Sequence, residues 1–277
     1  MAGTLLAVDI GNAVVQVGLA RDGRLLARWE LASTPAATED EALLALDGFL
    51  RAAREGLAAP LGDARPDEVA RAAAERPADA ALASVVPALT GSWAGAARRL
   101  TGQRPLVVGP GVKTGLRMGY KDPGEVGADR IADLVAARET YGAPLIVVDL
   151  GVATTVEVID EEGAFAGGLI MPGLGLGARA LAAEAARLPE VEVRAPEALV
   201  GRSTAEAMRA GIVWGETARL DGLAALIAES LGCEPALVLS GKDAGLIAGL
   251  LRHEAAVDET LALRGLMRLH ALNRKPR

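Results

Sequence analysis

The sequence is poor in cysteine and histidine, two residue types that carry much of enzyme chemistry. It has one cysteine and two histidines among 277 residues. The single Cys233 excludes an intrachain disulfide and any metal site built from several cysteines. Both histidines, His253 and His270, are expected in C-terminal helices, which disfavours zinc hydrolysis and Ser-His catalysis. We therefore expect carboxylates to carry any catalysis.

The chain also lacks an excess of basic charge and lacks long apolar runs. Its formal net charge is −7, so no basic face for nucleic acid or for an anionic membrane is indicated. No uninterrupted apolar run approaches the roughly 18 residues of a membrane span. Because 51% of the residues are apolar, the chain can bury the core of one large domain or of two lobes. We expect a cytoplasmic protein that binds neither nucleic acid nor membrane.

Two familiar phosphate-binding motifs are missing as well. The P-loop sequence G-x-x-x-x-G-K-[ST] does not occur in the chain. Asp-x-Gly motifs occur at residues 9–11 and 149–151, but each continues into a strand pattern instead of opening a helix. P-loop and dinucleotide-binding folds are therefore excluded.

An internal duplication is the most informative pattern that is present. When Leu5 is laid on Leu145, "LLAVDIGNAVV" aligns with "LIVVDLGVATT", which pairs Asp9 with Asp149 and Gly11 with Gly151. Buried strands often end in Asp-x-Gly turns for structural reasons alone. Here, however, both motifs are followed by a further strand, so the pair indicates a repeated unit. We predict an α/β fold of two similar lobes that face one another across a cleft.

Further elements follow from periodicity and from turn residues. Asp22-Gly23 predicts a hairpin turn, and a buried strand is expected to end at Pro87. Helices are expected over the acidic segment 38–57, from near Asp129, over 175–187 and over 203–231. A strand is expected over 236–240.

The two aspartates suggest how such lobes bind a nucleotide. A carboxylate withdrawn from water costs several kcal/mol unless it is paired. Glycine lets backbone N–H groups approach phosphate oxygens closely, and a carboxylate attracts the cation that accompanies phosphate. Asp9 and Asp149 are therefore predicted to hold cations beside nucleotide phosphate.

The segment "GYKDPGEVGADRIAD" offers a third carboxylate. Asp129 could be the N-cap of a helix, and Arg130 would then be an ordinary surface charge. Alternatively, Asp129 is a general base that accepts a proton from a substrate alcohol, and Arg130 or the turn's backbone holds an anionic group of the substrate. The residues alone leave both interpretations open.

The chain resembles type III pantothenate kinases, which belong to the acetate kinase, sugar kinase, Hsp70 and actin superfamily. The resemblance covers nearly the whole length. The carriers are "LLAVDIGN", "TEDEALLAL", "ASVVPALT", "PLVVGPGVKTGLRMGYKDPGEVGADRIAD", "VVDLGVATT", "GGLIMPG", "LVGRSTAEAMRAGIVWG" and "LRGLMRL". The resemblance implies two ribonuclease H-like (actin-like ATPase) lobes over residues 1–130 and 131–277, each a mixed sheet flanked by helices.

The resemblance also implies the reaction, the phosphorylation of pantothenate by ATP as the first step of coenzyme A biosynthesis. It implies Mg²⁺, a monovalent cation (K⁺ or NH₄⁺) and a homodimer. Asp129 would be the proton acceptor, and the other substrate-binding residues would be Tyr120, Gly127, Ala128, Arg130 and Thr204. From the residues alone, Thr204 is equally well read as the N-cap of the following helix.

The ATP site and the cation sites are implied in the same way. The ATP-binding residues would be Asp9, Ile10, Gly11, Asn12, Ala13, Gln16, Gly151 and Val152. Asp149 would bind the monovalent cation, and Asp9 would hold Mg²⁺ through phosphate or water.

Four positions depart from the family pattern, all of them on the nucleotide side. Ala13 and Val152 replace threonines, Gln16 replaces a lysine, and Lys242 replaces a glycine. Each hydrogen bond lost to a charged group is worth roughly 1.5–3 kcal/mol. A second hypothesis therefore stays open, in which the chain is a catalytically weak paralogue that binds pantothenate or a related acid and acts as a regulator.

Overall fold

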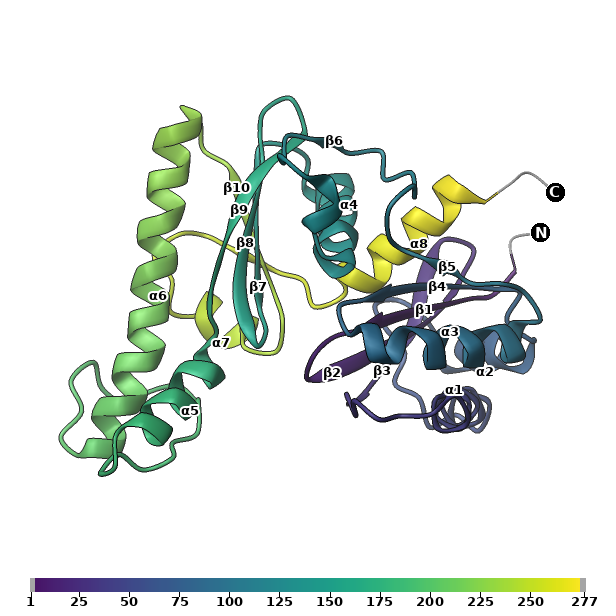
Figure 1. Cartoon of the computed structure of the whole chain (residues 1–277), viewed down its shortest axis with the longest axis horizontal. Coiled ribbons are helices and arrows are strands. Elements are labelled where there is room, and N and C mark those ends of the chain that lie inside the picture. Colours follow the sequence, from purple (N-terminus) through teal and green to yellow (C-terminus); the bar gives the residue numbers. More distant parts are fainter. Residues whose placement is uncertain (1–2, 275–277) are drawn as a thin grey trace. The chain divides into compact units, whose positions relative to one another are not determined.

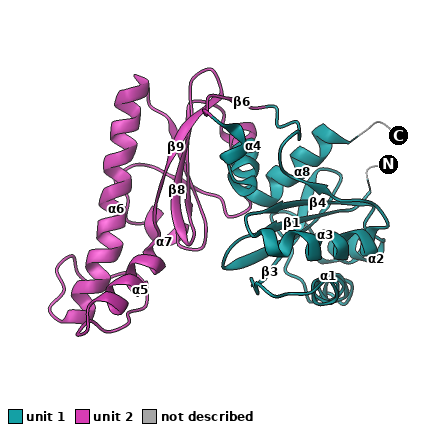
Figure 2. Cartoon of the chain, viewed as in Figure 1, with its two compact units in different colours: residues 1–115, 122–136, 261–277 teal, residues 116–121, 137–260 magenta. Residues whose placement is uncertain are grey.

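The computed structural model describes residues 3–274, which form two compact units (Figure 2). Among these residues, unit 1 comprises 3–115, 122–136 and 261–274, and unit 2 comprises 116–121 and 137–260. This division differs from a cut at residue 130, because the C-terminal helix returns to unit 1 and another helix passes from one unit into the other. The boundary at residue 130 stays a prediction about the duplicated lobes.

Unit 1 contains a five-stranded mixed sheet in the order β3-β2-β1-β4-β5. The strands β1 to β3 pair antiparallel, whereas β4 runs parallel to β1 and to β5. The predicted hairpin turn at Asp22-Gly23 is present, and both residues have positive φ angles. The bounds are β1 Leu5–Ile10, β2 Val14–Arg21, β3 Arg24–Ala32, β4 Asp79–Ser84 and β5 Leu106–Val107.

Helices cover both faces of this sheet (Figure 1). The side chains of Leu6, Val8 and Ile10 share one core with α1 to α3, while Gly18 of β2 faces Leu263 of α8 on the other side. The strand expected to end at Pro87 stops at Ser84, because proline fits the first turn of a helix and opens α3. The bounds are α1 Glu39–Arg54, α2 Pro66–Ala74, α3 Pro87–Thr101, η1 Pro123–Glu125, α4 Ala128–Tyr141 and α8 Leu261–Asn273.

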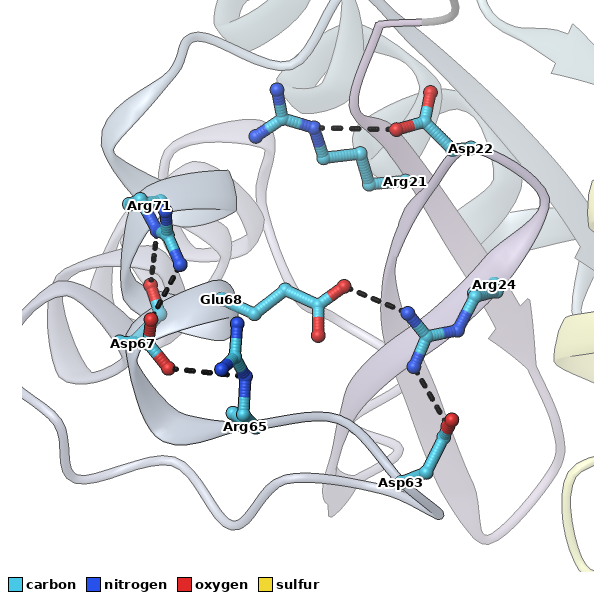
Figure 3. Close-up of polar contacts among 8 residues, drawn as sticks. All are labelled: Arg21, Asp22, Arg24, Asp63, Arg65, Asp67, Glu68 and Arg71. Carbon is cyan, nitrogen blue, oxygen red and sulfur yellow. Dashed lines mark hydrogen bonds and ion pairs between the residues drawn. The ribbon is translucent and has the colours of Figure 1, made fainter.

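A group of surface ion pairs joins the β2–β3 hairpin to the segment that enters α2 (Figure 3). Arg24 reaches Asp63 at 2.7 Å and Glu68 at 2.9 Å. Within the same segment, Arg71 pairs with Asp67. These groups are largely solvated, so they fix a local geometry and contribute little to stability.

Unit 2 contains a six-stranded mixed sheet in the order β11-β10-β7-β8-β9-β6. The strands β7, β8 and β9 pair antiparallel, and β10 lies parallel to β7. The edge strands β6 and β11 pair parallel to β9 and β10. The bounds are β6 Arg117–Met118, β7 Leu145–Leu150, β8 Ala153–Ile159, β9 Ala164–Pro172, β10 Ala236–Ser240 and β11 Ala256–Val257.

The long helix α6 (Thr204–Leu231) runs along one face of the unit 2 sheet (Figure 1). Together with α5 (Leu174–Glu184) and α7 (Ala244–Ala248), it packs on Ile146, Val148 and other inward residues of β7, β8 and β10. Although α6 has 28 residues, no helix within residues 3–274 is both long and apolar enough to cross a membrane.

The structure confirms the predicted repeat. β1 begins at Leu5 and β7 at Leu145, the two residues that the sequence alignment lays on one another. In the same alignment β3, at residues 24–32, coincides with β9, at residues 164–172. β1 and β7 also share one burial pattern, in which only the aspartate is half-buried. Each copy is a three-stranded antiparallel unit within a mixed sheet that is flanked by helices.

One expectation about the histidines is wrong. His270 lies in α8 as expected, but His253 lies in a turn between α7 and β11. The carboxylate of Asp221 on α6 accepts the backbone N–H groups of Arg252 and His253, and its Oδ1 lies 2.8 Å from Nδ1 of His253. This carboxylate thus holds the backbone of Arg252 and His253 in a turn, and His253 does not belong to a helix.

Candidate active site

The first Asp-x-Gly turn connects β1 to β2 in unit 1. Asp9 is half-buried near the end of β1, and the N–H of Gly11 donates to the carbonyl of Val14 at 3.0 Å. The carbonyl of Ala13 accepts the N–H of Ser33 at 2.9 Å, which ties the turn to the end of β3. The side chains of Asn12 and Ala13 are exposed, so a ligand can reach the tip of a turn whose backbone is fixed.

Gln16 lies opposite Asp9 in the β1–β2 register. Its Nε2 donates to Oε1 of Glu30 on β3 at 3.3 Å. The position therefore carries an uncharged side chain that is engaged with a neighbouring carboxylate. It adds no positive charge to the turn.

Asp129 lies in the first turn of α4, which begins at Ala128. Its Oδ1 accepts the N–H of Arg130 at 2.7 Å. An N-cap residue precedes the first helical residue, whereas Asp129 is the second residue of α4, so the N-cap interpretation is wrong. Burial raises the pKa of the Asp129 carboxyl. A Cβ on Gly127 would lie 2.4 Å from Asp129 Oδ1, so the carboxylate occupies space that only glycine leaves open.

Within unit 1, the structure brings Asp129 and the first turn to the same edge of the sheet. The N–H of Val85, just beyond β4, donates to the carbonyl of Ile10 at 3.1 Å. The Cγ1 atom of the same Val85 lies 3.4 Å from the position of a Cβ on Gly127. β1 and β4 are parallel, so the first turn and Val85 follow the carboxyl ends of adjacent parallel strands. α/β sheets commonly bind ligands at this edge.

The second Asp-x-Gly turn connects β7 to β8 in unit 2. Asp149 is half-buried, and the N–H of Gly151 donates to the carbonyl of Ala153 at 3.1 Å. A Cβ on Gly151 would lie 3.1 Å from Oδ2 of Asp149, and a Cβ on Gly241 would lie 2.7 Å from its Oδ1. Both carboxylate oxygens therefore face glycine backbone. Carboxylate oxygens are ligands that suit a cation preferring oxygen.

A third glycine closes the second turn from the side of β9. The N–H of Gly173 donates to the carbonyl of Val152 at 3.1 Å. A Cβ on Gly173 would lie 2.5 Å from the carbonyl oxygen of Gly151 and 2.7 Å from that of Val152. Val152 is nevertheless 40% exposed.

The remaining predicted substrate residues lie on separate elements. Arg130 is 9% exposed, so its interpretation as a surface charge is wrong. Tyr120 follows β6 and stacks on Phe165 of β9, with ring centroids 5.4 Å apart. Thr204 is exposed at the start of α6, where Ser203 is the N-cap and accepts the N–H of Glu206. The N-cap interpretation of Thr204 is therefore wrong.

Comparison with known proteins decides the family. The family described as type III pantothenate kinase matches residues 5–226. The chain belongs to this family. A type III pantothenate kinase of Anaeromyxobacter sp. (strain K) is 40% identical over 271 residues, which are 98% of this chain and 100% of that protein. One from Brevibacillus brevis is 36% identical over 269 residues, or 97% and 99% of the two chains.

A solved structure supports the fold. The ethanolamine utilization protein EutJ from Carboxydothermus hydrogenoformans matches with a TM-score of 0.51 at 16% identity, covering 99% of this chain and 91% of that one. At this identity the likeness concerns the fold alone. The predicted class, two actin-like ATPase lobes, is confirmed.

The loop after β10 carries the last departure from the type III pantothenate kinase pattern. Lys242 is exposed in a loop in which Gly241 approaches Asp149 and Asp243 follows. Burial raises the pKa of the Asp243 carboxyl, although the charge of Lys242 opposes the shift. The loop thus places a positive charge in the segment next to the second turn.

Sequence reasoning gave no role to three residues that contact the predicted site residues or their turns. Phe165, Gly173 and Gly241 each contact a predicted residue or its turn. Gly173 was visible within the "GGLIMPG" block, but its contact with the second turn depends on strand pairing that is distant in sequence. Within residues 3–274, no three His, Cys, Asp or Glu side chains gather as a metal site, so a cation here would complete its shell with phosphate, carbonyl or water oxygens.

Proposed function

We propose that the protein transfers the γ-phosphoryl group of ATP to the primary hydroxyl of pantothenate, giving 4'-phosphopantothenate in the first step of coenzyme A biosynthesis. One observation carries the proposal. Asp129, whose carboxyl has a raised pKa, lies at the same edge of the unit 1 sheet as the first Asp-x-Gly turn. The chain as a whole belongs to the type III pantothenate kinase family.

Asp129 acts as the proton acceptor. Because burial raises its pKa, the carboxylate of Asp129 is a stronger base than an exposed aspartate. The substrate hydroxyl donates its proton to Asp129 as its oxygen bonds to phosphorus, and ADP leaves. Because the transition state of phosphoryl transfer is loose, the carboxylate chiefly orients the hydroxyl.

Pantothenate binding is assigned to residues that combine polar groups with fixed backbone. Arg130 or the N-terminal backbone of α4 holds the carboxylate of pantothenate, a task suited to a planar guanidinium. The stacking of Tyr120 on Phe165 fixes the tyrosine ring. The proposed set is Tyr120, Gly127, Ala128, Asp129, Arg130 and Thr204.

ATP binding is assigned to the two turns, each within its own unit. The backbone N–H groups bind phosphate oxygens, and Mg²⁺ associates with Asp9 through phosphate or water. Asp149 binds the monovalent cation, K⁺ or NH₄⁺, which supplies positive charge beside the phosphates. The proposed nucleotide set is Asp9, Ile10, Gly11, Asn12, Ala13, Gln16, Gly151 and Val152.

The active form is proposed to be a cytoplasmic homodimer. Large apolar side chains of unit 2 are exposed, which favours coverage by a second copy. They include Ile170, Leu176, Leu181, Leu199, Val200 and Leu226. Light scattering on the purified protein should give twice the mass of one chain, and a single-chain mass at micromolar concentration contradicts the dimer.

The test of the reaction is pantothenate-dependent ADP formation in the presence of Mg²⁺ and K⁺. Asp129→Asn should lower kcat on the order of 10²–10⁴-fold and leave KM for ATP nearly unchanged. Glu125→Gln is the matched control, because Glu125 is an exposed carboxylate of the same segment. If Asp129→Asn keeps most of the turnover, the base role is wrong. Clear pantothenate binding without turnover in the unmodified protein favours the binding paralogue.

A further inference from the structure

A buried acid on α6 is bonded to the strand that follows the second turn. Glu216 is 5% exposed, and its Oε1 accepts the hydroxyl of Thr154 on β8 at 2.7 Å. Thr154 itself is completely buried and pairs with Leu150 across the turn. The carboxylate of Glu216 therefore holds β8 at Thr154, the residue that directly follows the turn at 149–153.

The second oxygen of the same carboxylate is connected, through Arg219, to the chain segment on the opposite side of the turn. Oε2 of Glu216 pairs with the guanidinium of Arg219, one helical turn further along α6. The same guanidinium nitrogen donates to the carbonyl of Pro172 at 3.1 Å. Pro172 precedes Gly173, whose N–H donates to Val152. One ion pair on one helix thus holds both chain segments that border the turn.

The energetics point to a geometric role for this pair. The side chain of Glu216 is 5% exposed and that of Arg219 33%, so the pair has lost only part of its hydration. Apolar side chains of similar volume often hold a fold as well as such a pair does. Attaching α6 to the sheet therefore does not require these charges, since apolar contacts of Val213 and Leu220 already do so. What the pair adds is direction, because hydrogen bonds to the Thr154 hydroxyl and the Pro172 carbonyl fix positions that apolar packing leaves adjustable.

We propose that Glu216 and Arg219 are positioning residues that hold the turn at residues 149–153 in the geometry needed to bind nucleotide phosphate and its cation. The proposal rests on the proposed kinase function. It assigns to α6 the task of fixing a turn in which Val152 offers no hydroxyl to the phosphates. Neither residue touches the substrate.

The test compares two buried threonines that undergo the same chemical change. Thr154→Val removes the hydroxyl that reaches Glu216. Thr217→Val removes a hydroxyl of α6, the helix that carries Glu216; this hydroxyl donates to the carbonyl of Val213 in its own helix, at 2.9 Å. Thr154→Val should raise KM for ATP about tenfold and leave KM for pantothenate within about twofold. Thr217→Val should change neither, and Thr154→Ser should restore the ATP value.

Amide hydrogen exchange of residues 150–154 in the ligand-free protein gives a readout independent of activity. Exchange should be faster in Thr154→Val and in Glu216→Gln with Arg219→Gln, and unchanged in Thr217→Val. Equal behaviour of the two valine variants overturns the proposal, as does faster exchange with unchanged ATP affinity. If the unmodified protein binds ATP without phosphorylating pantothenate, the proposed reaction fails, while exchange and ATP affinity still decide the positioning role.

Discussion

The two Asp-x-Gly turns have the same strands around them but different support. In unit 1, a Cβ on Gly11 would meet only the carbonyl of Val14, at 2.9 Å. In unit 2, the turn around Gly151 is approached by Gly173 and Gly241, and its flanking segments are held by Glu216. The first turn is held by its own hairpin and by backbone hydrogen bonds from Ser33 and Val85. The second turn is shaped by three elements that are distant in sequence.

This difference indicates what a duplication keeps. The strand lengths and their spacing within each copy persist because one residue of slippage would turn every side chain to the wrong face of the sheet. The groups that support a turn face no such restriction, so each copy acquires its own. The replaced threonines therefore stand in unlike settings, Ala13 in an open turn and Val152 in a supported one.

The largest expected effect separates the two turns by steric means. Gly173→Ala places a methyl group against two carbonyl oxygens at 2.5 and 2.7 Å. Moving these oxygens shifts the backbone of the turn and weakens the bond from the Gly173 N–H to the Val152 carbonyl, so the free energy of unfolding should fall by about 1–3 kcal/mol. Gly11→Ala meets a single carbonyl and should cost less. Thermal unfolding of both variants, followed by circular dichroism, measures the difference.

Gly91→Ala is the control for this pair, because nothing lies within 4 Å of its added Cβ. It lies within α3, where alanine is a better helix former than glycine. The midpoint of unfolding should therefore stay or rise. Equal losses for Gly173→Ala and Gly11→Ala would show that the two turns are supported alike.

The next effect concerns the missing hydroxyls. Ala13→Thr and Val152→Thr place a hydroxyl at exposed positions of the first and second turns. A hydrogen bond to a charged phosphate is worth roughly 1.5–3 kcal/mol, so ATP affinity should rise about tenfold or more for each change. Val152→Thr should gain more, because a fixed turn loses less entropy on binding. Titration calorimetry with a nonhydrolysable ATP analogue measures both, and an unchanged affinity contradicts the phosphate role of that turn.

A smaller effect concerns Asp129, which belongs to neither turn. Burial raises the pKa of its carboxyl in the folded protein, so the native state binds the proton more tightly than the unfolded chain. Stability then decreases as pH rises from the ordinary aspartate pKa through the raised one, and the full cost remains above it. Asp129→Asn should therefore raise the midpoint of unfolding near neutral pH and lose this gain in acid. A lower midpoint at neutral pH contradicts the direction of the shift.

Much of the fold could be predicted from local pattern. Alternating apolar residues and the turn at Asp22-Gly23 give the first hairpin, and the match of Leu5 to Leu145 gives the second copy. The return of α8 to unit 1 could not be predicted, because an apolar helix face does not state which sheet it covers. The prediction of a helix at His253 was wrong for a similar reason, because the carboxylate of Asp221 that organises its turn is distant in sequence.

The candidate site divides in the same way. The residue types in "GADR" predict a carboxylate beside a guanidinium, but whether Asp129 caps a helix or lies within its first turn depends on where α4 begins. The role of Gly173 could not be predicted, because its contact with Val152 follows from the β8–β9 register. The sequence around Glu216 gives no signal, since a buried glutamate and an exposed one look identical on a helix.

The smallest effect tests how each hairpin is closed beyond its turn. Arg24 begins β3 and pairs with Asp63 and Glu68, whereas Ala164 stands at the same place in the second copy and donates its N–H to Asp160 Oδ1 at 2.8 Å. Arg24→Met removes only solvated ion pairs, so the midpoint of unfolding should shift by no more than about 2 °C. The shift should vanish at about 1 M salt, where the screening length is a few ångströms. A loss that persists at high salt would mean that the aliphatic part of Arg24, and not its charge, supports the hairpin.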